Sequence, residues 1–288
     1  MLKRNLALLA ELSKIKITFA VALTTIAGYL LASGNFDSGL ILPTLGIFIL
    51  ACGSSALNHY QDSDRDQLME RTKNRPIPSG RISKNNTLLV AIALSAVGSG
   101  MIYLGSDFVG FQLGLLALIW YNAIYTPMKR KTAFAVIPGS VIGAIPPVVG
   151  WVAGGGSVFD PQALLLAFFF FIWQVPHFWL LMLKYGDEYI QAGYPSITQL
   201  YDERQIRYFT FLWTLATAVS ALMLPLFGLV HSTVITILVI IAVFYLVIAF
   251  AGILRNNNQV FNPFHYFMRI NYFVLIMIIA LSVDRFIN

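Results

Sequence analysis

Charged side chains are scarce in this sequence: Asp, Glu, Lys and Arg make up 11% of the 288 residues, whereas hydrophobic residues make up 58%. A soluble domain of this size carries about 25% charged residues, so the composition excludes an ordinary soluble domain and indicates a membrane protein. Cysteine occurs once, as Cys52, which excludes an internal disulfide framework and a metal site built from several cysteines. Glu11 and Lys14 interrupt the first apolar stretch early, so we expect no cleavable signal peptide.

Long apolar runs dominate the sequence, and nine of them reach the length of about 17–25 residues that a helix needs to cross a bilayer. They lie near residues 17–33, 40–57, 87–104, 108–125, 134–153, 161–183, 208–230, 233–254 and 267–283. The runs are continuously apolar and do not alternate, so they predict helices and not a β-barrel. The prediction is an all-α fold: a single polytopic membrane domain over residues 1–288, with nine transmembrane helices.

The basic residues predict how the helices are oriented. With nine spans, the N-terminus and every second connection lie on the same side of the membrane. Eighteen of the nineteen Lys and Arg residues fall on that side, and only Arg285 falls on the other. The positive-inside rule therefore predicts a cytoplasmic N-terminus. This distribution also accounts for the net charge of +6 without a nucleic-acid partner.

Charge is concentrated between two apolar runs, in residues 56–84, which hold four acids and six bases. Asn58, Asp62 and Asp66 recur at intervals of four, which places them on one face of a helix, whereas Asp64 points away from that face. Amide and carboxylate oxygens are hard ligands that suit Mg²⁺. The spacing therefore predicts a magnesium site at the cytoplasmic end of the second span, with carboxylates exposed to the ion.

Bases follow the acids in the same segment. Arg71, Lys73 and Arg75 are suitable donors for phosphate oxygens, and Pro76 and Pro78 prevent a helix from continuing there. The segment thus predicts a metal site beside a diphosphate site. For the bases alone, a solvated cytoplasmic loop is the simpler interpretation, but it does not explain the spacing of the carboxylates.

A second polar group ends the sixth run and continues into the connection after it. Gln174 and His177 are three residues apart, on one helix face at membrane depth, and Lys184, Asp187 and Glu188 follow just past the membrane edge. The two acids suit a second Mg²⁺ on the same diphosphate. Taken alone, they are equally well explained as an ordinary acidic pair in a loop.

A third candidate lies at the end of the fourth run, where Asn122 and Tyr125 share a helix face and Lys129, Arg130 and Lys131 follow. These residues suit diphosphate binding. They equally suit an interfacial tyrosine followed by cytoplasmic bases.

The charged segment resembles the first aspartate motif of the UbiA-type intramembrane prenyltransferases. The matching residues are Asn58, Asp62, Asp66, Met69, Arg71, Thr72, Arg75 and Pro76. Residues 125–132, 143–151, 173–179 and 187–193 are similar to segments of one branch, the protoheme IX farnesyltransferases. The second motif departs from the family pattern, because Tyr185 replaces a usual arginine and Glu188 a usual aspartate.

The resemblance implies a bundle around a central cavity that opens toward lipid, in the bacterial inner membrane. It implies Mg²⁺ as cofactor, farnesyl diphosphate as donor and haem b as acceptor substrate, with haem o and diphosphate as products. Downstream haem-modifying or oxidase-assembly proteins are the implied recipients. The implied metal-binding and catalytic residues are Asn58, Asp62, Asp66, Asp187 and Glu188. The implied substrate-binding residues are Arg71, Lys73, Arg75, Tyr125, Lys129, Arg130, Gln174, His177 and Lys184.

Three alternatives stay open at this point. His177 is either a ligand of the haem iron or a histidine bonded within the core. An intramembrane prenyltransferase with an aromatic or quinone-precursor acceptor would share the same donor site. A transporter or channel could use the carboxylates for ions, although transporters often place charges at mid-bilayer in broken helices, whereas these charges gather at helix ends.

Overall fold

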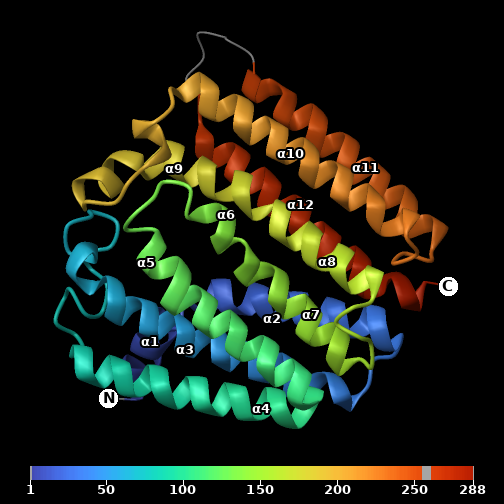
Figure 1. The fold of residues 1–288 in the computed structure, drawn as a ribbon, viewed down its shortest axis with the longest axis horizontal. Helices are drawn as coiled ribbons and strands as arrows, with labels where there is room; N and C mark the ends of the chain where they lie inside the picture. The colour runs from blue at the N-terminus through green and yellow to red at the C-terminus, as the bar shows by residue number, and fades with distance from the viewer. Residues whose placement is uncertain (1, 255–260, 288) are drawn as a thin grey trace.

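The computed structural model describes residues 2–254 and 261–287, which form an all-helical bundle without strands (Figure 1). The helices are α1 (Leu2–Leu12), α2 (Ile15–Ser33), α3 (Ile41–Asp66), α4 (Lys84–Ile119), α5 (Thr126–Met128), α6 (Val136–Gly139), α7 (Val141–Ala153), α8 (Pro161–Ile172), α9 (Gln174–Gln191), α10 (Glu203–Leu226), α11 (Thr233–Ala251) and α12 (Pro263–Val283). A π-helical turn, Trp120–Tyr125, joins α4 to α5.

Eight helical units in the described residues are long and apolar enough to cross a membrane. The longest, Lys84–Met128, has 45 residues, and its helix α4 breaks at Ser106 and Asp107, where Asp107 has a φ of 58°. Figure 1 shows the chain turning back at this break, so the unit supplies two antiparallel spans. Counted this way, the eight units supply the nine spans that the apolar runs predict.

The bundle packs through close helix pairs. Helices α3 and α4 lie together along their length, and so do α2 and α7. A large apolar core joins α8, α10, α11 and α12 to one side of α2 and α7, and a smaller one lies between α3, α4 and α7. Glycine permits the closest approaches: a Cβ on Gly28 would lie 1.9 Å from the carbonyl oxygen of Pro147.

We expect Gly28→Ala to destabilise the protein, because the added methyl group meets rigid backbone of α7 and forces α2 and α7 apart. Overpacking of this kind costs about 1–3 kcal/mol. The midpoint of thermal unfolding in detergent should therefore fall by several degrees. Gly100→Ala is the matched control, because a Cβ on Gly100 of α4 meets nothing within 4 Å and alanine favours a helix over glycine. Equal midpoints for the two variants would contradict the packing argument.

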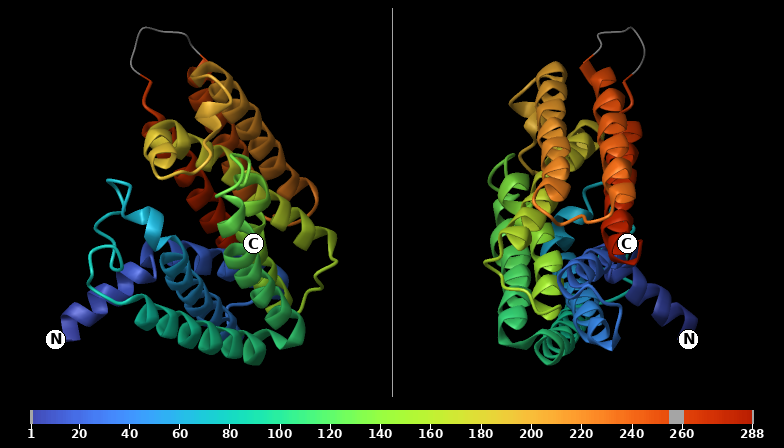
Figure 2. Two further views of the ribbon diagram at one scale, coloured as in Figure 1. Left: turned by 60° about the vertical axis from the view of Figure 1, so that its left-hand side comes forward. Right: turned by 90° about the vertical axis from the view of Figure 1, so that its right-hand side faces the viewer.

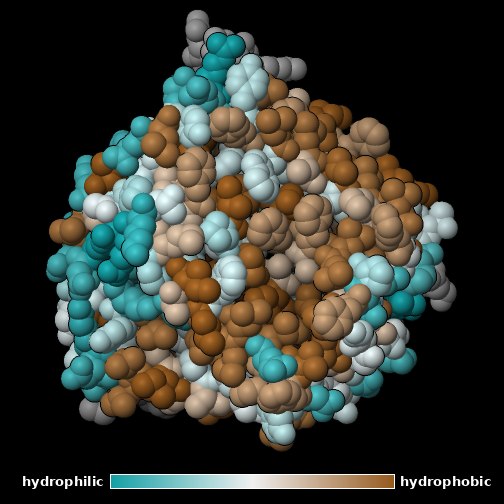
Figure 3. All heavy atoms as spheres, viewed as in Figure 1, coloured by the Kyte–Doolittle hydropathy of each residue, from teal (hydrophilic) through white to brown (hydrophobic). Residues whose placement is uncertain are grey.

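Charged connections gather at one end of the bundle. The α3–α4 and α9–α10 connections lie at the left in Figure 1, and the C-terminus lies at the right. Figure 3 shows hydrophilic residues along that left edge, hydrophobic side chains over the middle of the visible face, and smaller hydrophilic groups at the top and at the right edge. In both views of Figure 2, α1 projects from the bundle, and the left view shows it below the connection between α3 and α4. The cytoplasmic orientation of this end stays a prediction from the positive-inside rule.

Candidate active site

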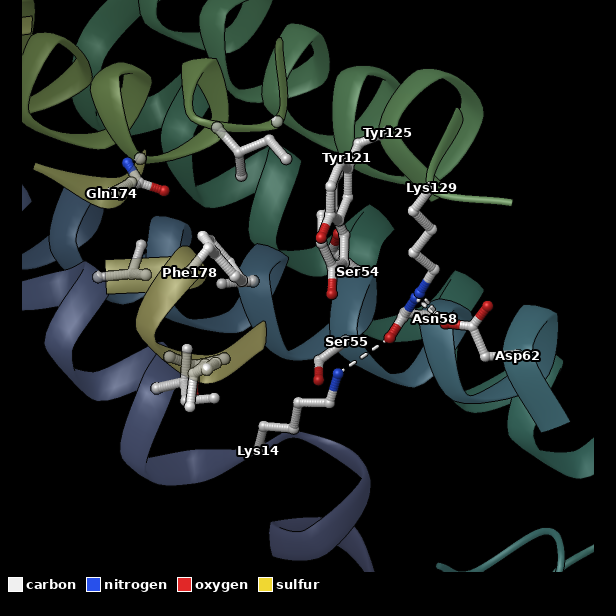
Figure 4. Close-up of a pocket in the computed structure, with 18 of the residues that line it drawn as sticks. Lys14, Ser54, Ser55, Asn58, Asp62, Tyr121, Tyr125, Lys129, Gln174 and Phe178 are labelled. Carbon is white, nitrogen blue, oxygen red and sulfur yellow. Dashed lines mark hydrogen bonds and ion pairs between the residues drawn. The ribbon is translucent and has the colours of Figure 1, made fainter. Parts of the chain in front are cut away.

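A cavity of about 390 Å³ lies between α2, α3, the end of α4, α7 and α9 (Figure 4). Its polar end is formed by Lys14, Asn58, Asp62, Asp66, Arg71, Arg75 and Lys129. Its apolar part includes Ile17, Val21, Ile47, Leu50, Leu118, Ile142, Pro146, Phe178 and Leu181. A ligand with a charged head and an apolar body would match this division.

The predicted stripe on α3 is confirmed as a shared face. Asn58, Asp62 and Asp66 all line the cavity, at 2%, 2% and 1% exposure. Asp64 points elsewhere, and its carboxylate pairs with Lys84 Nζ at 2.5 Å on the surface. The expectation of exposed carboxylates is wrong, however, because tertiary packing covers both acids and pairs them with cations.

Asp62 is held by four side chains. Lys129 Nζ pairs with Oδ2, Asn58 Nδ2 donates to Oδ2 at 2.7 Å, Arg130 Nη2 lies 3.3 Å from Oδ1 and the Tyr194 hydroxyl donates to Oδ1 at 3.1 Å. Burial lowers the pKa of Lys129, and the Asp62 carboxylate opposes that effect. The pair is therefore a preformed cation–anion contact inside the cavity.

Asp66 ends α3 and fixes the loop that follows. Arg75 Nη1 lies 2.8 Å from both carboxylate oxygens of Asp66, and Thr72 Oγ1 donates to the Asp66 carbonyl at 2.8 Å. The loop is also tied to α9, because the Arg71 backbone N–H donates to Glu188 Oε2 at 3.1 Å. These contacts bring both arginines, which the sequence predicts as phosphate donors, to the cavity wall.

Lys14 is a cavity residue that the candidate set from the sequence does not include. It lies between α1 and α2 in the left-handed conformation, with φ 48° and ψ 51°, and its Nζ donates to Asn58 Oδ1 at 2.9 Å (Figure 4). Burial lowers the pKa of Lys14 to about 7, assisted by the charges of Arg75 and Lys129. Two lysines, Lys14 and Lys16, precede the first apolar run, and the joint between the two helices decides which of them turns toward the cavity.

Aromatic rings line the wall opposite α3. Tyr121 and Tyr125 stack at 5.7 Å between ring centroids, and both face the cavity because they lie four residues apart in the π-helical turn. π-Helical turns of this kind occur often at functional sites. Tyr125 and Lys129 are thus placed at the cavity as the sequence predicts, and Tyr121 adds to them.

The second polar group lies on a helix and not in a loop. Helix α9 continues to Gln191, so Lys184, Asp187 and Glu188 lie on its last turns, and the prediction that they belong to the connection after the helix is wrong. None of these three side chains lines the cavity. Over the described ranges, no group of three or more His, Cys, Asp or Glu side chains is close enough to hold one ion. A second Mg²⁺ on this helix stays a prediction.

Two further predicted bases lie outside the cavity lining. Lys73 pairs with Glu70 at 2.6 Å on the surface. Arg130 does not line the cavity itself. Its side chain donates to Asp62 Oδ1 and to the Gln61 carbonyl.

His177 does not line this cavity, although Gln174 does. The His177 ring packs against Trp173, Phe178 and Phe267, with centroids at 5.0, 5.3 and 4.5 Å. Gln174 Nε2 donates to the Ser140 and Phe170 carbonyls at 3.1 and 2.7 Å. The structure therefore separates two residues that their spacing placed on one face.

Comparison with known proteins identifies the family. The sequence profile described as the UbiA prenyltransferase family matches residues 21–272. The protoheme IX farnesyltransferase of Geobacter sulfurreducens is 41% identical over 208 residues, which are 72% of this chain and 76% of the relative. That of Oleidesulfovibrio alaskensis is 34% identical over 285 residues, which are 97% of this chain and 96% of the relative.

Solved structures share the fold at lower identity. A digeranylgeranylglyceryl phosphate synthase superposes with a TM-score of 0.78 at 16% identity, covering 98% of this chain and 99% of that one. A UbiA homologue from Archaeoglobus fulgidus bound to DMAPP and Mg²⁺ gives 0.73 at 16% identity, covering 96% and 99%. The chain is therefore an integral membrane protein of the UbiA prenyltransferase family, in the part of that family that contains the protoheme IX farnesyltransferases.

Proposed function

We propose that this protein transfers a farnesyl group from farnesyl diphosphate to a vinyl group of haem b. The observation that carries the proposal is the buried pair Asp62 and Asp66, set with Arg75 and Lys129 at the edge of an apolar cavity. That arrangement fits a diphosphate with a long apolar chain. The relatives named protoheme IX farnesyltransferase, at 34–41% identity over most of the chain, support haem b as the acceptor.

The donor set on α3 fits Mg²⁺. Asn58, Asp62 and Asp66 offer hard oxygen ligands along one helix face, and waters and phosphate oxygens would complete the shell. When bound there, Mg²⁺ would neutralise charge on the departing diphosphate. We also propose Asp187 and Glu188 as ligands of a second ion, because Glu188 already contacts the loop that carries Arg71.

The reaction breaks the bond between C1 of the farnesyl group and the diphosphate oxygen, and the electron pair leaves with the diphosphate. Arg71, Arg75 and Lys129 stabilise that developing charge. The haem vinyl group forms the new bond to C1. The resulting cation takes the oxygen of a water molecule, which releases a proton and leaves a hydroxyethylfarnesyl group.

The cavity protects the cationic centre before the vinyl group attacks. Its wall is largely apolar, which limits premature capture by water. The faces of Tyr121 and Tyr125 border the same space and can stabilise a cation through their π systems.

The test is incubation of the purified protein with haem b, farnesyl diphosphate and Mg²⁺, followed by mass spectrometry of the haems. We expect haem o to form, and its formation to stop when a chelator removes Mg²⁺. Transfer of farnesyl to an aromatic or quinone-precursor acceptor, with none to haem b, would replace haem b as the acceptor and keep the donor site. The absence of any prenyl transfer would overturn the proposal.

A further inference from the structure

Lys14 is a partly buried cavity cation whose charge is not paired with a carboxylate. Both cavity carboxylates form ion pairs with other cations: Asp62 pairs with Lys129 and Arg130, and Asp66 pairs with Arg75. None of the ion pairs in residues 2–254 and 261–287 includes Lys14. Its Nζ donates instead to the neutral amide oxygen of Asn58. An ammonium group that is partly removed from water and has no counter-charge is unfavourable, so the site is suited to an incoming anion.

The backbone holds Lys14 in place. It is one of two non-glycine residues with positive φ in the described chain. Residues other than glycine rarely adopt this backbone conformation. Its neighbours Leu12 and Ser13 are buried at 1% and 3% exposure, which fixes the joint between α1 and α2. Figure 4 shows the Lys14 side chain extending from the start of α2 toward α3. The ammonium group is therefore preorganised at the cavity wall.

Lys14 contacts the proposed metal site at its Asn58 end, which is the end farther from Arg75. Asn58, its partner, precedes Asp62 by one helical turn and Asp66 by two, which is about 6 and 12 Å along the α3 axis. On its own helix, Lys14 is followed by Ile17, which belongs to the apolar lining. An anion at Lys14 could therefore lie beside the metal site, with an apolar body along the lining that includes Ile17.

We propose that Lys14 binds a carboxylate of the prenyl acceptor. The inference rests on the proposed function, under which the acceptor is haem b and the carboxylate is one of its propionates. The propionates lie on the edge of the macrocycle opposite the vinyl groups. Anchoring one of them fixes which edge of the acceptor faces the farnesyl C1, so Lys14 sets acceptor specificity without serving the donor.

The experiment compares haem b with its dimethyl ester, in which both propionates are neutral. Binding to detergent-solubilised protein is followed by the visible absorption of the haem. Wild-type protein should bind haem b about tenfold more tightly than the ester, since a hydrogen bond to a charged group contributes about that much. Lys14→Met should lose this preference and bind the ester as the wild type does, whereas Lys14→Arg should retain it.

Lys16→Met is the matched control, because Lys16 is exposed on the same helix and does not line the cavity; it should bind both haems as the wild type does. Unchanged affinity of Lys14→Met for a non-hydrolysable farnesyl diphosphate analogue would show an intact fold and an unaffected donor site. A Lys14→Met protein that keeps the preference for haem b, or that loses the analogue instead, would overturn the inference. The haem o assay tests the proposed function separately. If the wild type forms haem o, the proposed function stands whatever the Lys14 variants bind; if it forms none, the proposed function is wrong.

Discussion

Asp62→Asn and Asp66→Asn should each lower the rate of haem o formation about a hundredfold or more, the order of loss seen when one charge-stabilising group is removed from an active site. Both carboxylates line the cavity, and an amide is a poorer ligand for Mg²⁺ than a carboxylate. Asp64→Asn should leave the rate nearly unchanged, because Asp64 faces the surface and pairs with Lys84. The measurement is the initial rate at saturating Mg²⁺ and farnesyl diphosphate.

The same substitutions should also reduce stability, because each leaves a cation without its partner. Asp62→Asn removes the counter-charge of Lys129, and Asp66→Asn removes that of Arg75. Thermal unfolding in detergent, measured beside the rates, separates the two effects: rates compared well below each midpoint report on chemistry alone. Equal rate losses for Asp64→Asn and the other two variants would contradict the assignment of the α3 face.

The α3 face could be predicted from the sequence because helical periodicity is a local property. Residues four apart share a face whatever the helix packs against, so Asn58, Asp62 and Asp66 were placed together correctly. The burial of the two acids could not be predicted in the same way. The burial depends on two distant cations. Lys129 lies just after α5 and pairs with Asp62, and Arg75 lies in the loop after α3 and pairs with Asp66.

The errors on α9 have a related cause. Hydropathy falls after residue 183, but the helix continues to Gln191, because a helix end is set by capping and packing as well as by the membrane boundary. Gln174 and His177 are 60° apart around the helix. They can therefore share one face, or one can face the cavity while the other faces a neighbouring helix. The sequence alone does not show which of the two residues faces the cavity. In the structure, His177 packs against Phe267 of α12.

The break inside α4 is a feature that the sequence predicts correctly. The turn is so short that only Ser106 and Asp107 have non-helical backbone angles between the two helices, yet the apolar runs ending at residue 104 and beginning at 108 predict two spans. The polar pair Ser106 and Asp107 interrupts the apolar sequence just where the chain reverses. Composition therefore locates this turn better than helix length does.

Arg75→Met is expected to destabilise the protein by about 3–5 kcal/mol, because it leaves the Asp66 carboxylate buried without a counter-charge. Arg75 Nη1 contacts both oxygens of Asp66, whose side chain is 2% exposed. The midpoint of thermal unfolding in detergent should fall accordingly. Arg81→Met is the matched control: Arg81 also pairs with a carboxylate, that of Glu11, but both side chains are exposed, and surface pairs contribute about 0–1 kcal/mol.

A double-variant cycle tests whether this loss comes from the ion pair. Adding Asp66→Asn to Arg75→Met removes the uncompensated charge, so the double variant should be more stable than Arg75→Met alone, with a coupling energy of about 1–3 kcal/mol. Restored stability should not bring back binding of the farnesyl diphosphate analogue, because the double variant lacks both the Arg75 guanidinium and the Asp66 carboxylate that we assign to the donor site. Strictly additive losses of stability would refute the ion pair, and wild-type affinity for the analogue in Arg75→Met would remove Arg75 from the donor site.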